Sequence, residues 1–247
     1  MLHYLFPNWP APAHIKACTS LRFDGVSEGP YASFNLGKGG DSPEAVIANR
    51  QRLMAELNLI HEPVWLKQVH GTHAIQADTM HAQSTEADAS FTSVPNIVCA
   101  VITADCLPLL LCNTAGDQVA AIHAGWRGLA AGIIENTLSH LKQPQDQWLA
   151  WLGPAIGPSM FEVGEEVRQA FLQHDPKAQT AFKAKSHDKW LADLYALAKQ
   201  RLHACGVSRI YGGGFCTYSD ASRFYSYRRG QGKTGRMASL IWLQGNT

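Results

Sequence analysis

Cys106 and His123 are metal-binding residue types, and each stands where an apolar stretch of the sequence ends. Cys106 follows the apolar run 97–102 and the residues Thr-Ala-Asp, and His123 ends the run 119–122. The carboxyl ends of buried strands are where α/β proteins usually place their chemistry. Thiolate and imidazole together suit Zn²⁺ and also copper. The two residues therefore predict a soft-metal centre, with a buried thiol and a core histidine as the simpler alternative.

A third ligand is expected near another strand end, where two histidines compete. The stretch 64–69 is predicted to be a strand, and it is followed by His70 and Gly71, with His73 close behind. Spacing alone does not choose between His70 and His73. Three protein ligands with an open fourth position are the pattern of catalytic zinc, which lowers the pKa of bound water to about 7.

The turn after His123 reads Ala-Gly-Trp-Arg-Gly and resembles an anion site. Helix-start N–H groups bind anions, and Arg127 could hold a phosphate or carboxylate through two hydrogen bonds or stand as a surface cation. Asp105 could orient a metal-bound water or a ligand histidine, or be a turn residue. Arg50 lies among the apolar positions of a predicted helix, where snorkelling to solvent is slightly favoured over anion contact.

The elements that must position these residues are short. Apolar runs separated by short turns predict a mixed or antiparallel sheet in place of strict βαβ alternation. Strands are expected over 14–23, 64–69, 74–77, 88–91, 97–102, 107–112, 118–123, 147–152, 207–211 and 238–243. Helices are expected from Pro43 to Leu57 and over 128–141, 164–172 and 190–203, with a long glycine-rich loop over 24–40. One domain over residues 1–247 is the simplest organisation.

Composition limits the function classes. The 247 residues are 46% hydrophobic and 17% charged with a formal net charge of +1, which predicts a folded chain without global attraction to nucleic acid or anionic membranes. No apolar run reaches the roughly 18–20 residues of a membrane helix, and the proline-rich N-terminus is unlike a secretory signal. Six irregularly spaced cysteines predict reduced thiols in the cytoplasm. We expect a monomer or a weak homo-oligomer.

Ordered motifs over nearly the whole chain resemble the YfiH-type laccase-domain family, also called multicopper polyphenol oxidoreductase or peptidoglycan editing factor, whose members include purine nucleoside phosphorylases. One departure is Asp24, where the family commonly has a glycine, and it concerns that turn and not the metal site. The matching motifs are Gly25-Val26-Ser27, Asn35-Leu36-Gly37, Gln68-Val69-His70-Gly71, Thr103-Ala104-Asp105-Cys106-Leu107-Pro108, His123-Ala124-Gly125-Trp126-Arg127-Gly128, Gly153-Pro154-Ala155-Ile156-Gly157, Cys216-Thr217, Phe224-Tyr225-Ser226-Tyr227-Arg228-Arg229 and Gly235-Arg236.

The resemblance assigns the metal ligands to His70, Cys106 and His123, and thereby selects His70 over His73. It implies an α/β (α+β) fold: a mixed β-sheet sandwich flanked by helices, YfiH-like and related to cysteine-hydrolase-like folds. It also implies a zinc-dependent enzyme that converts adenosine, inosine or guanosine and phosphate to the base and ribose 1-phosphate. Methylthioadenosine phosphorolysis and adenosine deamination are implied as further activities.

The roles of neighbouring residues are hypotheses. Deamination needs a proton shuttle, for which Asp105 is the candidate. Phosphorolysis needs an anion pocket beside the ribose, and hydrogen bonds are expected to hold the sugar or base. The residues expected to bind phosphate are Arg50, Arg127 and Arg228, and those expected to hydrogen-bond the nucleoside are Asn35 and Gln68.

Three other functions compete with this one. A copper-dependent polyphenol oxidoreductase needs several coppers with many histidine ligands, and the 11 histidines include no HxH pair. A cysteine hydrolase acting on an amide of a peptidoglycan precursor would use Cys106 as nucleophile and His123 as base, which metal binding at Cys106 would prevent. A non-enzymatic, zinc-stabilised binding domain would unfold on chelation.

Overall fold

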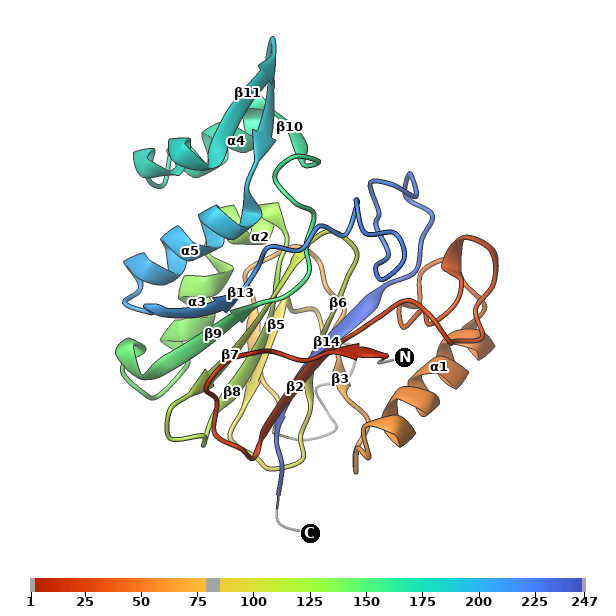
Figure 1. Ribbon diagram of the computed structural model, residues 1–247. Coiled ribbons are helices and arrows are strands. Elements are labelled where there is room, and N and C mark those ends of the chain that lie inside the picture. The colour runs from red at the N-terminus through yellow and green to blue at the C-terminus, as the bar shows by residue number, and fades with distance from the viewer. Residues whose placement is uncertain (1–2, 79–84, 246–247) are drawn as a thin grey trace.

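Two sheets packed face to face form the centre of the computed structural model, which describes residues 3–78 and 85–245 (Figure 1). Both sheets mix parallel and antiparallel pairs. The first contains, in order, β1 (Tyr4–Leu5), β2 (Ile15–Ser20), β14 (Met237–Leu243), β6 (Cys99–Thr103) and β3 (Val64–Trp65). The second contains β13 (Arg209–Gly212), β9 (Trp148–Leu152), β7 (Leu107–Asn113), β8 (Val119–Ala124), β5 (Ala89–Thr92) and β4 (Ala74–Gln76).

Helices cover the outer faces of this sandwich, so the molecule has four layers (Figure 1). α1 (Pro43–Glu56) packs Leu53 against the five-stranded sheet. The six-stranded sheet is covered by α2 (Trp126–Ala131), α3 (Ile133–Ser139) and α5 (Leu194–Ala204). Val101 and Leu110 belong to the apolar layer between the sheets. The predicted mixed sandwich flanked by helices is confirmed.

A third, small sheet projects from one end of the molecule (Figure 1). It consists, in order across the sheet, of β10 (Glu162–Gly164), β12 (Lys189–Ala192) and β11 (Phe182–Ser186). In the chain, α4 (Glu165–Leu172) and the 3-10 helix Pro176–Ala181 connect β10 to β11. The prediction of a helix over 190–203 was therefore wrong at its start. Residues 189–192 pair with two strands, and Asp193 caps α5 by accepting a hydrogen bond from the backbone N–H of Ala196.

Two other predicted elements differ from the structure. The helix expected over 128–141 is two helices, because Gly132 takes a left-handed backbone with φ +101° that ends α2. Of the strand expected over 64–69, β3 keeps two residues, and the remainder becomes the turn that carries His70. The other predicted strands and helices agree with the structure to within three residues at either end.

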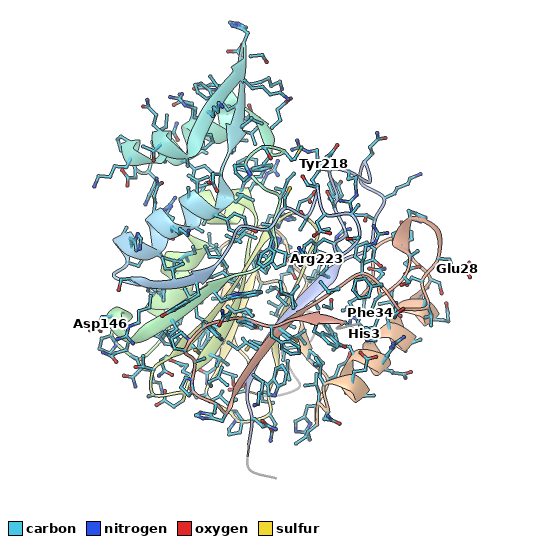
Figure 2. The ribbon with its side chains drawn as sticks, in the orientation of Figure 1. His3, Glu28, Phe34, Asp146, Tyr218 and Arg223 are labelled. Carbon is cyan, nitrogen blue, oxygen red and sulfur yellow. The ribbon has the colours of Figure 1, made fainter. Side chains whose placement is uncertain are left out.

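Two long segments, 21–42 and 213–236, close one end of the sandwich and hold each other in place. Tyr225 donates its hydroxyl hydrogen to the backbone oxygen of Tyr31 over 2.6 Å, and the N–H of Leu36 donates to the oxygen of Arg236 over 3.1 Å. Figure 2 shows Phe34 of the first segment beside α1, and Tyr218 and Arg223 of the second across the end of the sheets. The predicted metal ligands lie at this end. Within the described part of the chain, no helix is long and apolar enough to span a membrane.

Candidate metal centre and its pocket

The three predicted ligands come together although they belong to separate elements. Their ligating atoms lie within 4.8 Å of one another, and Nε2 of His70 is 3.8 Å from Sγ of Cys106. The rings of His70 and His123 meet edge to face with centroids 4.8 Å apart. Cys106 directly precedes β7 and His123 lies near the end of β8, and these two strands are paired. The antiparallel pairing therefore brings two ligands together, and the turn after β3 supplies the third.

The donor set fits a zinc-sized ion. Zn²⁺ takes imidazole nitrogen at about 2.0–2.1 Å and thiolate sulfur at about 2.3 Å, which places nitrogen and sulfur about 3.5 Å apart around a tetrahedral ion. The 3.8 Å between His70 and Cys106 is close to that spacing. Gly125 leaves room for the cluster, because a Cβ there would stand 2.9 Å from the ring of His70 and 3.1 Å from the sulfur of Cys106.

Asp88, a buried residue directly before β5, orients two of the three ligands. Its Oδ1 accepts from Nδ1 of His123 at 2.7 Å and from the backbone N–H of His70 at 2.9 Å. Its Oδ2 accepts from the N–H groups of Gly71 at 2.7 Å and Val69 at 3.2 Å. A carboxylate that accepts a hydrogen bond from one imidazole nitrogen fixes the tautomer, so the other nitrogen has a lone pair directed at the metal. The carboxylate also holds the turn in which His70 adopts φ +61°.

Sequence reasoning missed Asp88. The available signal was a carboxylate directly before a buried strand, in the stretch Ala-Asp-Ala-Ser-Phe. Because buried charges are paired or hydrogen-bonded, an aspartate in such a position should be followed to its partner.

The electrostatics favour the thiolate form of Cys106. Burial alone would raise the pKa of the Cys106 thiol, but the charges and hydrogen bonds of His123 and His70 outweigh it and lower this pKa to about 6. Burial would lower the pKa of His123, but Cys106 and Asp88 raise it to about 9. Burial likewise opposes ionisation of Asp88, while His123 and the N–H groups of Gly71 and Val69 lower its pKa. A thiolate is thus already favoured at neutral pH, as a metal ligand requires.

Asp105 fastens the segment 213–236 to the metal centre. Its Oδ1 accepts from the hydroxyl of Thr217 at 2.6 Å, and its Oδ2 from the hydroxyl of Ser226 at 3.0 Å and the N–H of Arg228 at 2.7 Å. Three of about four acceptor positions of a carboxylate are therefore occupied. Asp105 also adopts φ +89°, beside the ligand Cys106. These contacts give it a positioning role in addition to the proton-transfer role predicted from sequence.

The metal ligands open into a pocket of about 760 Å³. Apolar and aromatic side chains form much of its wall, among them Trp65, Trp126, Ile156, Phe161 and Tyr227. Asp105 is the one carboxylate among the described lining residues. The lining cations are Lys38, Arg50, Lys67, Arg127, Arg228 and Arg236.

Most of these cations keep their charge free for a ligand. Lys67 pairs with Glu86 at 2.6 Å, whereas the other five form no ion pair with a carboxylate in residues 3–78 and 85–245. Arg127 and Arg228 are exposed at the pocket, and Nη2 of Arg228 donates to the backbone oxygen of Glu162 at 3.0 Å. Arg50 is buried, so the favoured interpretation of a side chain that snorkels to solvent was wrong.

The two amides predicted to touch the nucleoside differ in place. Gln68 lines the pocket and uses its amide to donate to, and accept from, the backbone of Ile102. One N–H and one acceptor position of Gln68 remain available. Asn35 is buried outside the lining, and its amide makes hydrogen bonds to Gly37, Asp41 and the N–H of Arg236. All its hydrogen-bonding positions are occupied, so the structure gives Asn35 the role of fixing this turn.

The fold and the site define a class: four-layer α/β proteins with a two-histidine, one-cysteine centre beneath a cationic pocket. Residues 16–244 match the family described as multi-copper polyphenol oxidoreductase laccase, and the chain belongs to this family. This confirms the resemblance drawn from the sequence motifs.

Curated relatives and solved structures agree with this assignment. The chain is 53% identical to a purine nucleoside phosphorylase YfiH of Escherichia coli, over 98% of this chain and 100% of that protein. It is 47% identical to a purine nucleoside phosphorylase of Haemophilus influenzae, over 96% and 98%. Among solved structures, protein NMB0706 of Neisseria meningitidis matches with a TM-score of 0.94 at 48% identity, over 99% and 100%. YlmD of Geobacillus stearothermophilus matches with a TM-score of 0.90 at 29% identity, over 99% and 97%.

Proposed function

We propose that this protein is a zinc-dependent purine nucleoside phosphorylase that converts adenosine, inosine or guanosine and phosphate to the base and ribose 1-phosphate. The observation that carries the proposal is the His70–Cys106–His123 centre at the base of a pocket with unpaired cations. The names of the curated relatives support phosphorolysis. The donor set supports zinc, since thiolate and imidazole in a three-ligand centre suit this ion.

The pocket residues supply binding and charge for the reaction. Phosphorolysis breaks the bond between C1′ of the ribose and the purine nitrogen, forms a bond from C1′ to a phosphate oxygen, and leaves the base with a proton. Arg50, Arg127 and Arg228 offer positive charge to the phosphate, and a phosphate held beside C1′ no longer pays the entropy of a bimolecular encounter. Gln68 is placed to hydrogen-bond the sugar or the base with its remaining amide positions. Zinc, when bound, supplies Lewis-acid activation of an oxygen.

Adenosine deamination and methylthioadenosine phosphorolysis belong to the same proposal. Deamination exchanges the amino group of adenine for a water oxygen and needs proton transfers, for which the pocket carboxylate Asp105 is the candidate. A monomer or weak homo-oligomer, a single domain over residues 1–247 and a place in the cytoplasm are also proposed. The cytoplasm rests on the irregular spacing of the cysteines in the sequence.

Two observations weigh against the competing functions. Among residues 3–78 and 85–245, His70, Cys106 and His123 form the one group of three or more ligating side chains close enough to share a metal. Several coppers, as a multicopper oxidase uses, would need further groups of this kind. A cysteine hydrolase would need Cys106 free to attack, and its sulfur lies in the ligand cluster.

The test is release of free base from adenosine and inosine, with and without phosphate, by protein whose metal content has been measured. We expect phosphate-dependent release of hypoxanthine from inosine and bound zinc near one equivalent. Cys106→Ser should lose the bound zinc and lower base release about a hundredfold or more. No phosphate-dependent release from either nucleoside would refute phosphorolysis, and stoichiometric copper with a visible thiolate absorption band would refute zinc.

A further inference from the structure

Three of the pocket cations, Lys38, Arg50 and Arg236, gather at one turn of the chain. They are separate from Arg127, which belongs to α2, and from Arg228, which contacts β10. The guanidinium of Arg50 donates from Nε and Nη2 to the backbone oxygen of Leu36 at 3.0 and 2.8 Å. Arg236 lies against Gly37, where a Cβ would stand only 2.6 Å from its Cγ. Lys38 follows in sequence and is exposed in the pocket. The residues Leu36–Lys38 thus assemble three positive charges from α1, the 213–236 segment and the first loop.

The turn is built to present these groups. Oδ1 of Asn35 accepts the N–H groups of both Gly37 and Arg236, at 3.0 and 2.8 Å. The face of the Arg50 guanidinium stacks on Trp65, with 3.9 Å from Cζ to the ring centroid. Such packing fixes a planar cation without neutralising it. An anion entering here would meet charges that are already in position.

Both arginines keep donors for a ligand. A guanidinium carries five N–H donors. Arg236 uses Nη1 on the backbone oxygens of Thr234 and Gly235, and its Nε and Nη2 have no hydrogen-bond partner within the described part of the chain. Arg50 directs its two hydrogen bonds to a single oxygen. Burial lowers the pKa of Arg50 to about 10, so it remains charged at neutral pH.

We propose that Lys38, Arg50 and Arg236 form a phosphoryl-binding subsite, called here the Leu36–Lys38 anion subsite. Its ligand is a tetrahedral dianion, which matches three cations better than a neutral nucleoside would. The dianion is either inorganic phosphate or the phosphate of a phosphorylated nucleoside. This subsite rests on the proposed function only for the identity of the nucleoside beside it, since anion binding is measurable without turnover.

The test measures dissociation constants by calorimetry on the metal-containing protein as purified. The probes are inorganic phosphate, inosine and inosine 5′-monophosphate, and the variants are Arg236→Gln and Lys38→Gln. Lys38 is exposed, so its variant reports on charge even if Arg236→Gln perturbs folding. Arg209→Gln, an exposed arginine of β13 outside the cavity lining, makes the same change of charge as a control.

We expect Arg236→Gln to weaken phosphoryl binding about tenfold or more, since a charge-assisted hydrogen bond is lost, with a smaller effect from Lys38→Gln and none from Arg209→Gln. If phosphate binding alone weakens, the subsite takes the inorganic ion. If the monophosphate binds more tightly than inosine and loses that advantage, the subsite takes a phosphorylated nucleoside.

Unchanged binding of phosphate and monophosphate in both Arg236→Gln and Lys38→Gln would overturn the subsite. Failure of phosphorolysis would look different. In that case no nucleoside would release base, while the variants would still weaken phosphoryl binding.

Discussion

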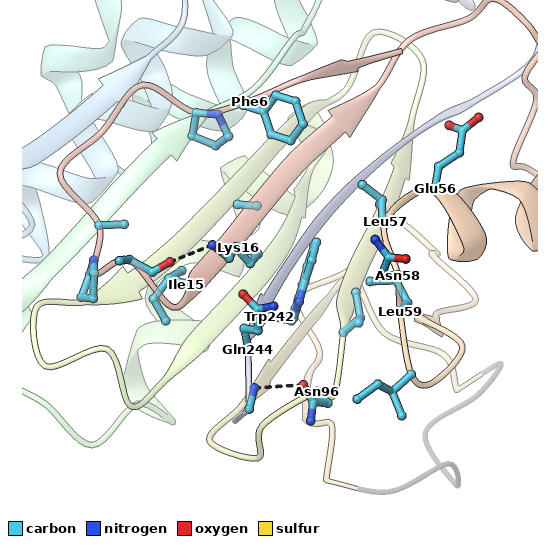
Figure 3. A pocket seen from close by; sticks show the side chains of 18 of the residues that line it. Phe6, Ile15, Lys16, Glu56, Leu57, Asn58, Leu59, Asn96, Trp242 and Gln244 are labelled. Atoms are coloured by element: carbon cyan, nitrogen blue, oxygen red, sulfur yellow. Dashed lines mark hydrogen bonds between the residues drawn. The ribbon is translucent and has the colours of Figure 1, made fainter. Parts of the chain in front are cut away.

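Two large cavities lined by described residues lie at opposite ends of β14, and they differ in what their polar groups do. A groove of about 520 Å³ lies beside Trp242 and the end of α1 (Figure 3). Its charged side chains and Asn96 already have partners in the protein: Lys16 donates to the backbone oxygen of Ala13, Asn96 accepts from Gly245, and Glu56 accepts from Tyr4. The metal pocket instead carries five cations without a carboxylate partner in the described chain.

The difference shows that cavity size alone does not mark a functional site. Both cavities have the volume of ordinary ligand pockets, which is about 300–1,000 Å³. In the groove, the charged side chains have partners within the protein. In the metal pocket, five cations have no carboxylate partner within the described residues, which is costly for folding and useful for binding.

The largest expected effect comes from removing a metal ligand. Cys106→Ser replaces a soft thiolate by a hydroxyl, so bound metal should be lost. Metal activation contributes several kcal/mol, and base release should fall about a hundredfold or more. The measurement pairs metal analysis with phosphorolysis assays, and circular dichroism checks the fold. Full activity of metal-free Cys106→Ser would show that the metal centre is not needed for the reaction, and the metal pocket would then have no chemical advantage over the groove.

A smaller effect is expected from Asp88, which touches the ligands without contacting the metal. Asp88→Asn keeps the size but loses a charge that His123 and the turn 69–71 use. Loss of such an orienting carboxylate typically lowers metal affinity about 10–100-fold. Competition with a chromophoric chelator measures the affinity. Glu86→Gln, an exposed partner of Lys67, is the matched control, and equal affinities for both variants would contradict the orienting role.

The lowered pKa of Cys106 moves the pH dependence of its reactivity to lower pH than that of an ordinary thiol. In chelated protein, alkylation by iodoacetamide should already proceed at pH 7, because the thiolate is the nucleophile and its pKa is lowered to about 6. The rate should fall as the pH drops through 6, where the thiolate is protonated, and change little between pH 7 and 9.

Mass spectrometry of peptides in a Cys216→Ser background isolates this signal, since the pKa of Cys216 is also lowered. Reloading zinc should protect Cys106. A midpoint near pH 9 in the chelated protein would show that His70 and His123 do not stabilise the thiolate.

Sequence reasoning succeeded where local pattern decides the outcome and stopped where distant contacts decide it. The strand ends before Cys106 and at His123 are visible as changes from apolar to polar residues, so the sequence indicates two ligands and the sheet end that holds them. The choice of His70 over His73 depended on family resemblance, because the pairing of β7 with β8 does not constrain a turn from the other sheet.

Long-range hydrogen bonds explain what the sequence left open. Asp88 reaches His123 across 35 positions, and Asp105 reaches Ser226 across 121. No periodicity reports such contacts. The short strands β10, β11 and β12 were also missed, because they are held by pairing with one another and not by a local pattern. The residues 189–192 fit a helix as well as a strand.

The smallest effect is expected in the groove. Phe6 is 54% exposed there, and exposed substitutions usually change the free energy of unfolding by no more than about 0.5 kcal/mol. Phe6→Ala should therefore leave both stability and phosphorolysis unchanged, as measured by urea denaturation and base release. A clear fall in activity with unchanged stability would show that the groove communicates with the metal pocket. Because β14 and β6 run between the two cavities, this strand pair would be the structural element that couples them.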